Sequence, residues 1–199
     1  MKLSRKIAVS VALGVVLSLV VSIGGFAVTC DNIRREVLRL HVIAASDSEA
    51  DQQLKLKVRD GVLAAGAEVF DGSVNVSNAV RKLTPELEKI EHTAENIVKE
   101  NGFDYDVKVT LSREFFATRT YENVTLPAGK YLAVKVVIDE GQGKNWWCVM
   151  FPTLCLPAAV VKTEIDDVLN EKEAKLVSRN PKFEPRFKIV EIIEKYFNS

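Results

Sequence analysis

The residue types best suited to chemistry gather in one stretch of the chain, Asp139 to Cys155. It holds both tryptophans and two of the three cysteines. A catalytic thiolate needs a base nearby, and His41 is a candidate base for Cys148 because catalytic partners need only meet in space. Cys148 lies in the run W-W-C-V-M-F, however, and apolar surroundings raise the pKa of a thiol and keep it protonated. The pattern favours a structural cysteine over a nucleophile.

Cys148 and Cys155 are also close enough in sequence for a local disulfide. Cysteines oxidise outside the cytoplasm, and closing so short a loop is worth about 2–3 kcal/mol. The alternative is two buried free thiols. The spacing alone does not choose between the two states.

Partner recognition is the second chemistry that this stretch suggests. Its candidate contacts are Lys144, Asn145, Trp146 and Trp147. Tryptophan is enriched at binding hot spots. Successive side chains of a strand point to opposite faces of the sheet, so at most one of the two tryptophans is expected to reach a partner. A wall-glycan-binding module is an alternative use of an exposed tryptophan.

A second candidate contact surface comprises His41 and the polar loop after its predicted strand, Ser46, Asp47 and Ser48. Serine followed three residues later by an acidic residue also caps a helix, which is the structural alternative for this loop. The chain has two histidines, and neither belongs to a zinc-binding motif. We predict no metal, no cofactor and no enzyme. An extracytoplasmic cell-wall hydrolase using His41 and Cys148 is the alternative.

The first 29 residues have the composition of an export signal. Lys2, Arg5 and Lys6 precede an uncharged run from Ile7 to Thr29. As a helix this run spans about 33 Å, enough to cross a bilayer. We predict a signal peptide or membrane anchor at 1–29, with cleavage left open, and a linker or short helix at 30–37.

The charge balance excludes one class of partner. Beyond residue 29 the chain carries 24 basic and 27 acidic residues, without a block of like charge. Nucleic-acid-binding domains need a basic patch. We therefore predict no nucleic-acid partner, and a single domain at 38–199.

The periodicity of apolar residues predicts the elements that position these residues. Strands are expected at 38–44, 105–111, 115–121, 132–138 and 146–151, and helices at 49–70, 76–101 with a break near Leu83, 159–170 and from Phe187 onward. The short glycine-containing connections between the later strands favour antiparallel pairing. The predicted fold class is α+β. Its N-terminal strand and helix pair pack on a largely antiparallel sheet of four to five strands, and a helix ends the chain.

Several motifs in this order resemble the stage II sporulation protein R family of endospore-forming bacteria, over about residues 38–155. They are A-A-S-D-S at 44–48, D-Q-Q-L-K at 51–55, R-D at 59–60, Thr118 with Tyr121, L-P-A-G at 126–129 with Tyr131, and G-Q-G-K-N-W-W-C-V-M-F-P at 141–152 with Cys155. The chain departs from the family pattern at Ala45, Ala117 and Thr153. The resemblance therefore assigns no function to those three positions.

This resemblance implies a role that composition does not reveal. Members of the family are made in the forespore and exported into the space between forespore and mother cell. There they trigger a membrane-embedded aspartic protease that matures pro-sigma-E. The resemblance thus implies a secreted or anchored signal whose partners are that protease and, through the N-terminal segment, a membrane.

Overall fold

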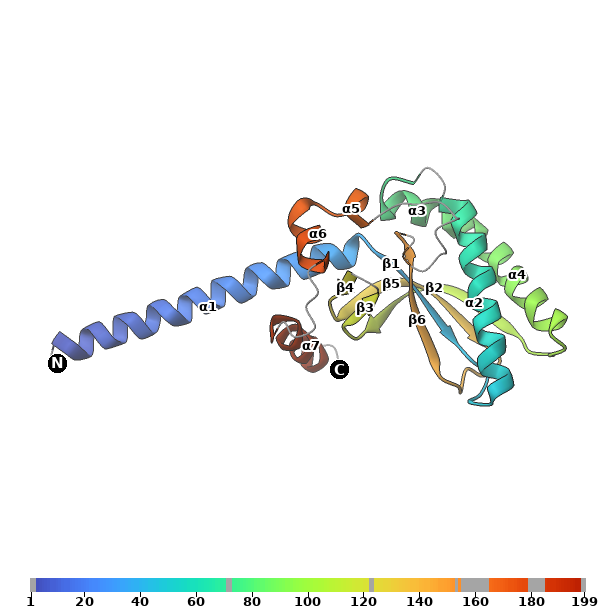
Figure 1. Ribbon diagram of the computed structural model, residues 1–199, viewed down its shortest axis with the longest axis horizontal. Coiled ribbons are helices and arrows are strands. Elements are labelled where there is room, and N and C mark those ends of the chain that lie inside the picture. The colour runs from blue at the N-terminus through green and yellow to red at the C-terminus, as the bar shows by residue number, and fades with distance from the viewer. Residues whose placement is uncertain are drawn as a thin grey trace.

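The computed structural model of the chain describes residues 3–70, 73–121, 124–152, 154, 165–178 and 185–197. A long N-terminal helix, α1, projects from an α+β domain, and the short C-terminal helices lie where α1 enters that domain (Figure 1). The arrangement confirms the predicted fold class.

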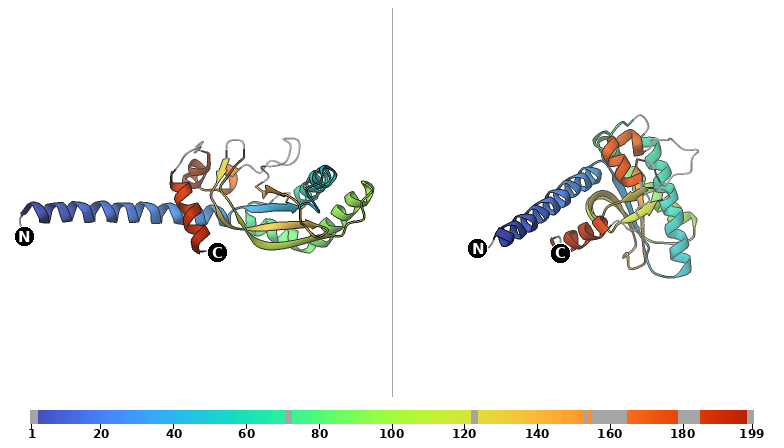
Figure 2. Two further views of the ribbon diagram at one scale, coloured as in Figure 1. Left: turned by 90° about the horizontal axis from the view of Figure 1, so that it is seen from below. Right: turned by 60° about the vertical axis from the view of Figure 1, so that its left-hand side comes forward.

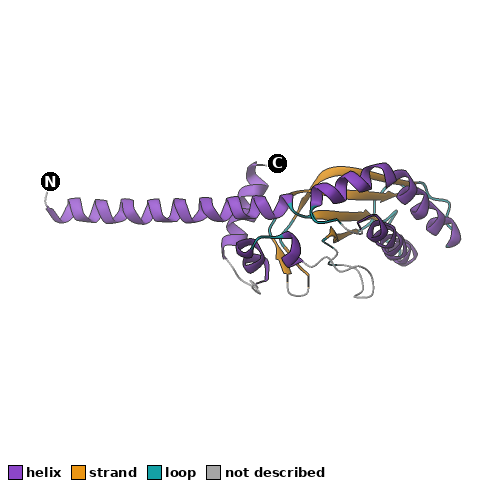
Figure 3. Ribbon diagram, turned by 90° about the horizontal axis from the view of Figure 1, so that it is seen from above, coloured by secondary structure: helices purple, strands orange, loops and turns teal. Residues whose placement is uncertain are grey.

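Helix α1 (Leu3–Arg35) is 33 residues long and has no acidic residue in its first turn. Its segment Arg5–Arg35 has a mean hydropathy of 2.6 over its most apolar window and, among the described residues, is the one helix long and apolar enough to cross a membrane. Most of it is exposed, but Phe26, Cys30 and Ile33 are buried against the domain. The residues predicted as a linker are therefore helical up to Arg35, and α1 enters the domain as one unbroken helix (Figures 2 and 3).

Four strands form the main sheet in the order β2-β5-β1-β6. Their bounds are β1 Leu38–Ile43, β2 Val107–Phe116, β5 Gly129–Ile138 and β6 Asn145–Phe151. Strand β1 pairs in parallel with β5 and antiparallel with β6, and β2 pairs antiparallel with β5. The sheet is thus largely antiparallel, as predicted, and its central strand comes directly after α1.

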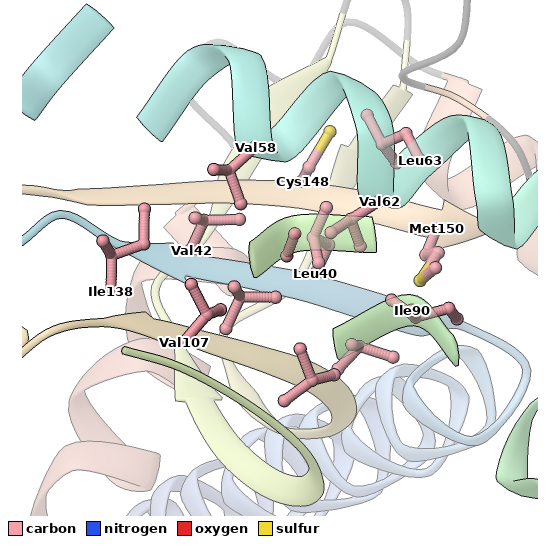
Figure 4. Packing of buried hydrophobic residues seen from close by; sticks show 14 of the residues in the cluster. Leu40, Val42, Val58, Val62, Leu63, Ile90, Val107, Ile138, Cys148 and Met150 are labelled. Carbon is pink, nitrogen blue, oxygen red and sulfur yellow. The ribbon is translucent and has the colours of Figure 1, made fainter. Parts of the chain in front are cut away.

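One face of this sheet is apolar, and we call it the apolar face. Strand β1 contributes Leu38, Leu40 and Val42 to it, all fully buried. Helices α2 (Glu49–Phe70) and α4 (Leu87–Glu100) cover it, with Val58 and Val62 of α2 above Leu40 and Val42 (Figure 4). The alternation of apolar residues along β1 therefore correctly predicted which face of the strand is packed against the helices.

The predicted break in the second helical region is also present. Helix α3 (Val76–Leu83) ends at the 3-10 turn η1 (Thr84–Glu86), and α4 follows. Pro85 stands in the first turn of that 3-10 helix, where its missing N–H costs no internal hydrogen bond. Helices α2 and α4 pack closely at Gly61, where a Cβ would lie 2.1 Å from Ile97 Cδ1 and would make that side chain shift.

The remaining elements lie toward the α1 end of the domain. They are β3 (Arg119–Tyr121), β4 (Val124–Leu126), α5 (Ile165–Val168), α6 (Glu171–Ser178) and α7 (Pro185–Phe197). The strand predicted at 115–121 is divided: Phe115 and Phe116 end β2, and residues 119–121 pair with β4 in a separate two-stranded sheet. The helix predicted at 159–170 is described only from Ile165, and its earlier residues lie outside the described part of the chain.

Candidate interaction surface

The second face of the main sheet carries charged and aromatic side chains, and we call it the polar face. Its members include Arg39, His41, Glu114, Lys135, Asn145 and Trp147. Arg39 and His41 alternate along β1 with the leucines and valine of the apolar face. The same strand therefore builds both faces.

Arg39 lies at the covered end of the polar face and is fully buried. Its guanidinium carbon is 4.2 Å from the ring centroid of Phe116, 4.9 Å from that of Tyr131 and 5.2 Å from that of Tyr121. Nε donates to the backbone oxygen of Cys148 at 2.9 Å, and Nη2 donates to the Tyr121 hydroxyl. Aromatic faces and neutral oxygens stabilise this cation, while burial lowers its pKa.

His41 lies two residues after Arg39 on β1, on the same face of the sheet. Its ring stacks on Trp147 with centroids 3.8 Å apart, and its Nε2 lies 2.9 Å from Asn145 Oδ1. Its Nδ1 is buried, has no hydrogen-bond partner among the described residues, and lies 3.8 Å from Glu114 Oε2. Lys135 Nζ lies 3.3 Å from the other oxygen of Glu114.

Burial lowers the pKa of His41, and the Asn145 hydrogen bond and the Glu114 carboxylate oppose that effect. The neutral ring is therefore the form that the fold favours. A neutral, stacked and hydrogen-bonded histidine suits a positioning role for Asn145 and Trp147.

Two loops meet at the end of β1 that lies away from α1. The backbone N–H of Lys144 donates to Asp47 Oδ1 at 2.8 Å, and that of Gly143 donates to the Ala44 oxygen at 2.9 Å. Glycine is required at 143, since a Cβ there would lie 2.2 Å from the Ser46 backbone oxygen. Buried Lys55 donates to the Lys144 oxygen at 2.9 Å. The family motifs at 44–55 and 141–147 thus hold each other in place.

Ser46 and Ser48 serve the start of α2, as the capping alternative predicts. The Asp51 N–H donates to Ser48 Oγ at 3.1 Å, and Ser46 Oγ donates to the Asp51 carboxylate. The Ser46 hydrogen bond is the largest cause of a lowered pKa at Asp51. A role for these serines in helix capping explains their position without a partner.

The junction of the two loops presents an exposed surface that we call the distal tip. It consists of Asp47, Ser48, Lys144, Asn145 and Trp146. Trp146 is 36% exposed, and the Arg59 guanidinium carbon lies 4.5 Å from its ring centroid. The tip lies at the far end of the domain from α1 (Figure 1). Strand β1, at about 3.3 Å per residue, separates the two by about 20 Å.

The structure divides the predicted contact residues into two connected groups. His41 contacts Asn145 and Trp147 on the polar face, while Asp47 contacts Lys144 at the tip. Trp146 and Trp147 point to opposite faces of β6, as their adjacency predicts. Ser46 is half-buried and faces Asp51 rather than solvent.

Sequence reasoning missed the residues that hold these groups together. Glu114 lies beside His41 and pairs with Lys135, and Lys55 holds the Lys144 loop. Arg39 packs under the same face on Phe116. One signal was present in the sequence: Arg39 and His41 alternate with apolar residues in a strand that turns out to be central. A charged residue at a central-strand position requires specific partners.

Cys148 and His41, the residues that suggested a nucleophilic pair, do not meet. Cys148 is buried in the apolar cluster with Leu40 and Met150, while His41 lies on the polar face. The predicted Cys148–Cys155 disulfide stays a prediction, since Cys155 lies outside the described residues. Thiol titration of the denatured chain before and after reduction tests it. Among the described residues no group of three His, Cys, Asp or Glu side chains could hold a metal ion.

These features define a class of protein: an α+β domain carried on an N-terminal helix that is able to cross a membrane. The chain belongs to the stage II sporulation protein R family, whose family model matches residues 34–182. It is 32% identical over 146 residues to stage II sporulation protein R of Bacillus subtilis (strain 168). The alignment covers 71% of this chain and 65% of that relative, slightly under two thirds of its length. No solved structure matches the chain.

Proposed function

We propose that this chain is a sporulation signal that is exported from the forespore and activates a membrane-embedded aspartic protease, which then processes pro-sigma-E. The observation that carries the proposal is membership of the stage II sporulation protein R family over residues 34–182. Helix α1 supports export, since it has the length and hydropathy of a signal peptide or anchor. The site of action proposed is the space between the forespore and mother-cell membranes.

The position of the distal tip supports this function physically. In an anchored chain, α1 enters the forespore membrane at one end of the domain, and the tip lies at the other end (Figure 1). The tip then faces away from its own membrane and toward the opposite one. A protein that signals across a narrow space needs such a projecting contact surface.

We assign the protease contact to the distal tip, with the polar face behind it as its support. His41 holds Asn145 through a 2.9 Å hydrogen bond, and Asp47 holds the Lys144 backbone at 2.8 Å. The Asn145 side chain and the Lys144 backbone are therefore ordered before binding, which lowers the entropy cost of binding. Activation follows if the tip binds the active state of the protease more tightly than the inactive state.

Coexpression of the chain with the protease and its pro-sigma substrate tests the proposal. The wild-type chain is expected to yield processed substrate, and absence of processing by a correctly exported chain contradicts the function. Lys144→Glu and Asn145→Ala are expected to reduce processing by about tenfold, the size of effect that about 1.4 kcal/mol of binding energy produces. The matched control is Lys89→Glu, a charge reversal at an exposed site on α4, which is expected to process normally.

If both tip variants still support processing, the protease contact lies elsewhere on the chain, while the proposed function stands. Immunoblotting of each exported variant separates a lost contact from lost protein. The assay thus tests the function and the contact surface separately.

The two alternative functions meet specific obstacles in the geometry. A hydrolase using His41 with Cys148 requires two side chains that lie on opposite faces of the sheet. A glycan-binding module requires a free tryptophan face, and Arg59 already covers Trp146 at 4.5 Å. A peptidoglycan pull-down with the wild-type chain tests the second alternative directly.

A further inference from the structure

Helix α7 packs against α1 at the point where α1 leaves the domain. The rings of Phe26 and Phe187 meet edge to face with centroids 5.3 Å apart. Cys30 and Val190 complete a small buried cluster with them. A shallow hollow beside this cluster is lined by Ser22, Ile23, Phe26, Ile189 and Val190. One side of α7 is therefore fixed to the outer part of α1.

The other side of α7 exposes large apolar residues. Ile189, Ile192 and Tyr196 are 39%, 48% and 82% exposed. Their spacing of three and four residues puts them on one helix face. Ile189 lies at the edge of this face beside the hollow, and Ile192 and Tyr196 point away from α1. Nothing among the described residues covers this face.

The position of α7 along α1 indicates what covers it. The uncharged run of α1 begins at Ile7, and a hydrocarbon core about 30 Å thick takes about 20 helical residues, which ends the core near Phe26. Phe26 is the residue that Phe187 contacts. Ile189 lines the same hollow as Ser22 and Ile23, which lie one turn nearer the N-terminus of α1 than Phe26. Helix α7 therefore lies at the level where lipid headgroups meet acyl chains.

The orientation of α7 agrees with this depth. Figure 2 shows α7 running crosswise to α1. If α1 stands along the membrane normal, α7 lies in the plane of the membrane. Interfacial helices adopt this arrangement, with their apolar face about 5–10 Å into the headgroup and acyl boundary.

We propose that α7 is an interfacial helix, and that the occupant of its Ile189, Ile192 and Tyr196 face is the phospholipid bilayer that α1 crosses. The chain then holds the membrane at two sites, the span α1 and the in-plane helix α7. The second site fixes the tilt of the domain, which α1 alone would leave free. The inference rests on the anchored form of the proposed signal.

The test uses the full chain reconstituted in phosphatidylcholine vesicles. An environment-sensitive fluorophore is attached at Ile192→Cys and, as the matched control, at Lys89→Cys on exposed α4. Phosphatidylcholine that carries a nitroxide near its headgroup is then added. The nitroxide is expected to lower the fluorescence at position 192 about twofold and to leave it unchanged at position 89, because an interfacial helix lies at the depth of the headgroups.

Equal, weak quenching at both positions would overturn the proposal. Disulfide crosslinking of Ile192→Cys between copies without lipid quenching would also overturn it, because a second copy would then cover the face. N-terminal sequencing of the exported protein is a third test. A mature chain that begins after Phe26 would overturn the proposal, because it would have no membrane span beside α7. Failure of the lipid test leaves protease activation standing, because the vesicles contain no protease.

Discussion

The two faces of the main sheet are equally buried around β1 but differ in how they are held. Leu40 on the apolar face and Arg39 on the polar face are both fully buried. Leu40 packs among apolar side chains of α2 and α4, and many side chains of similar volume satisfy such a site. Arg39 requires three aromatic rings and two oxygen acceptors in fixed positions.

The difference teaches which face contributes stability and which contributes specificity. Burying an aliphatic side chain is favourable by itself. Burying a cation costs desolvation free energy, and the interactions with its partners do little more than offset that cost. We therefore expect the apolar face to determine whether the domain folds, and the polar face to determine how the loops and tip behind it are arranged.

The largest effect expected is at Leu40. Leu40→Ala leaves a cavity between the sheet and its helices, and should lower the free energy of unfolding by about 3 kcal/mol. The measurement is urea unfolding of the full chain in detergent, followed by tryptophan fluorescence. Leu40→Met is the control, with an expected loss below about 1.5 kcal/mol. Equal losses for both would show that shape matters more at this site than we infer.

A smaller effect is expected at Arg39. Among the described residues no carboxylate forms an ion pair with it, so Arg39→Leu removes a buried charge together with its cation–π contacts and its two hydrogen bonds. The free energy of unfolding should change by less than about 1 kcal/mol in either direction. The same urea titration measures it. A loss as large as that of Leu40→Ala would break the comparison, because the polar face would then contribute stability as the apolar face does.

The smallest effect expected is a pH dependence at His41. Its pKa is lowered by burial, so the unfolded chain binds a proton more readily than the folded one. The stability gained from the neutral ring is complete above the unfolded value of about 6.5 and is lost as the pH falls below it. Urea titrations from pH 7.5 to 5.5 should show the stability difference between wild type and His41→Gln falling.

His92→Gln is the matched control for this measurement, since it removes an exposed histidine of α4 far from the polar face. A pH-dependent difference of the same size in that variant would contradict the assignment to His41. Glu114 and Lys135 face the ring with opposite charges and stay unchanged in both variants.

The sequence predicted the elements well wherever a local pattern specified them. Alternation along β1, the break at Pro85 and the opposite faces of Trp146 and Trp147 are all local features, and the structure confirms them. The fold class followed from their order along the chain.

The rest depended on contacts between distant parts of the chain. The cover of Arg39 includes Tyr121, 82 positions away, and the partner of Asp47 is Lys144, 97 positions away. Single-sequence periodicity contains no information on which distant residues meet. The sequence therefore showed that β1 contains polar residues but not which residues they contact. For this reason His41 was predicted as a contact residue and Arg39 was not.

The strand order has a consequence for the passage of the chain through a membrane. Strand β1 follows α1 at once, yet both of its neighbours come much later, β5 from Gly129 and β6 from Asn145. The residues after α1 cross in sequence order, so the central strand is delivered long before anything can pair with it. The sheet closes only when Phe151 has emerged, because such non-local pairing must wait for its partner. The strand order itself therefore delays folding. It keeps the chain unfolded, and so able to pass through the membrane, until all strands of the sheet have crossed.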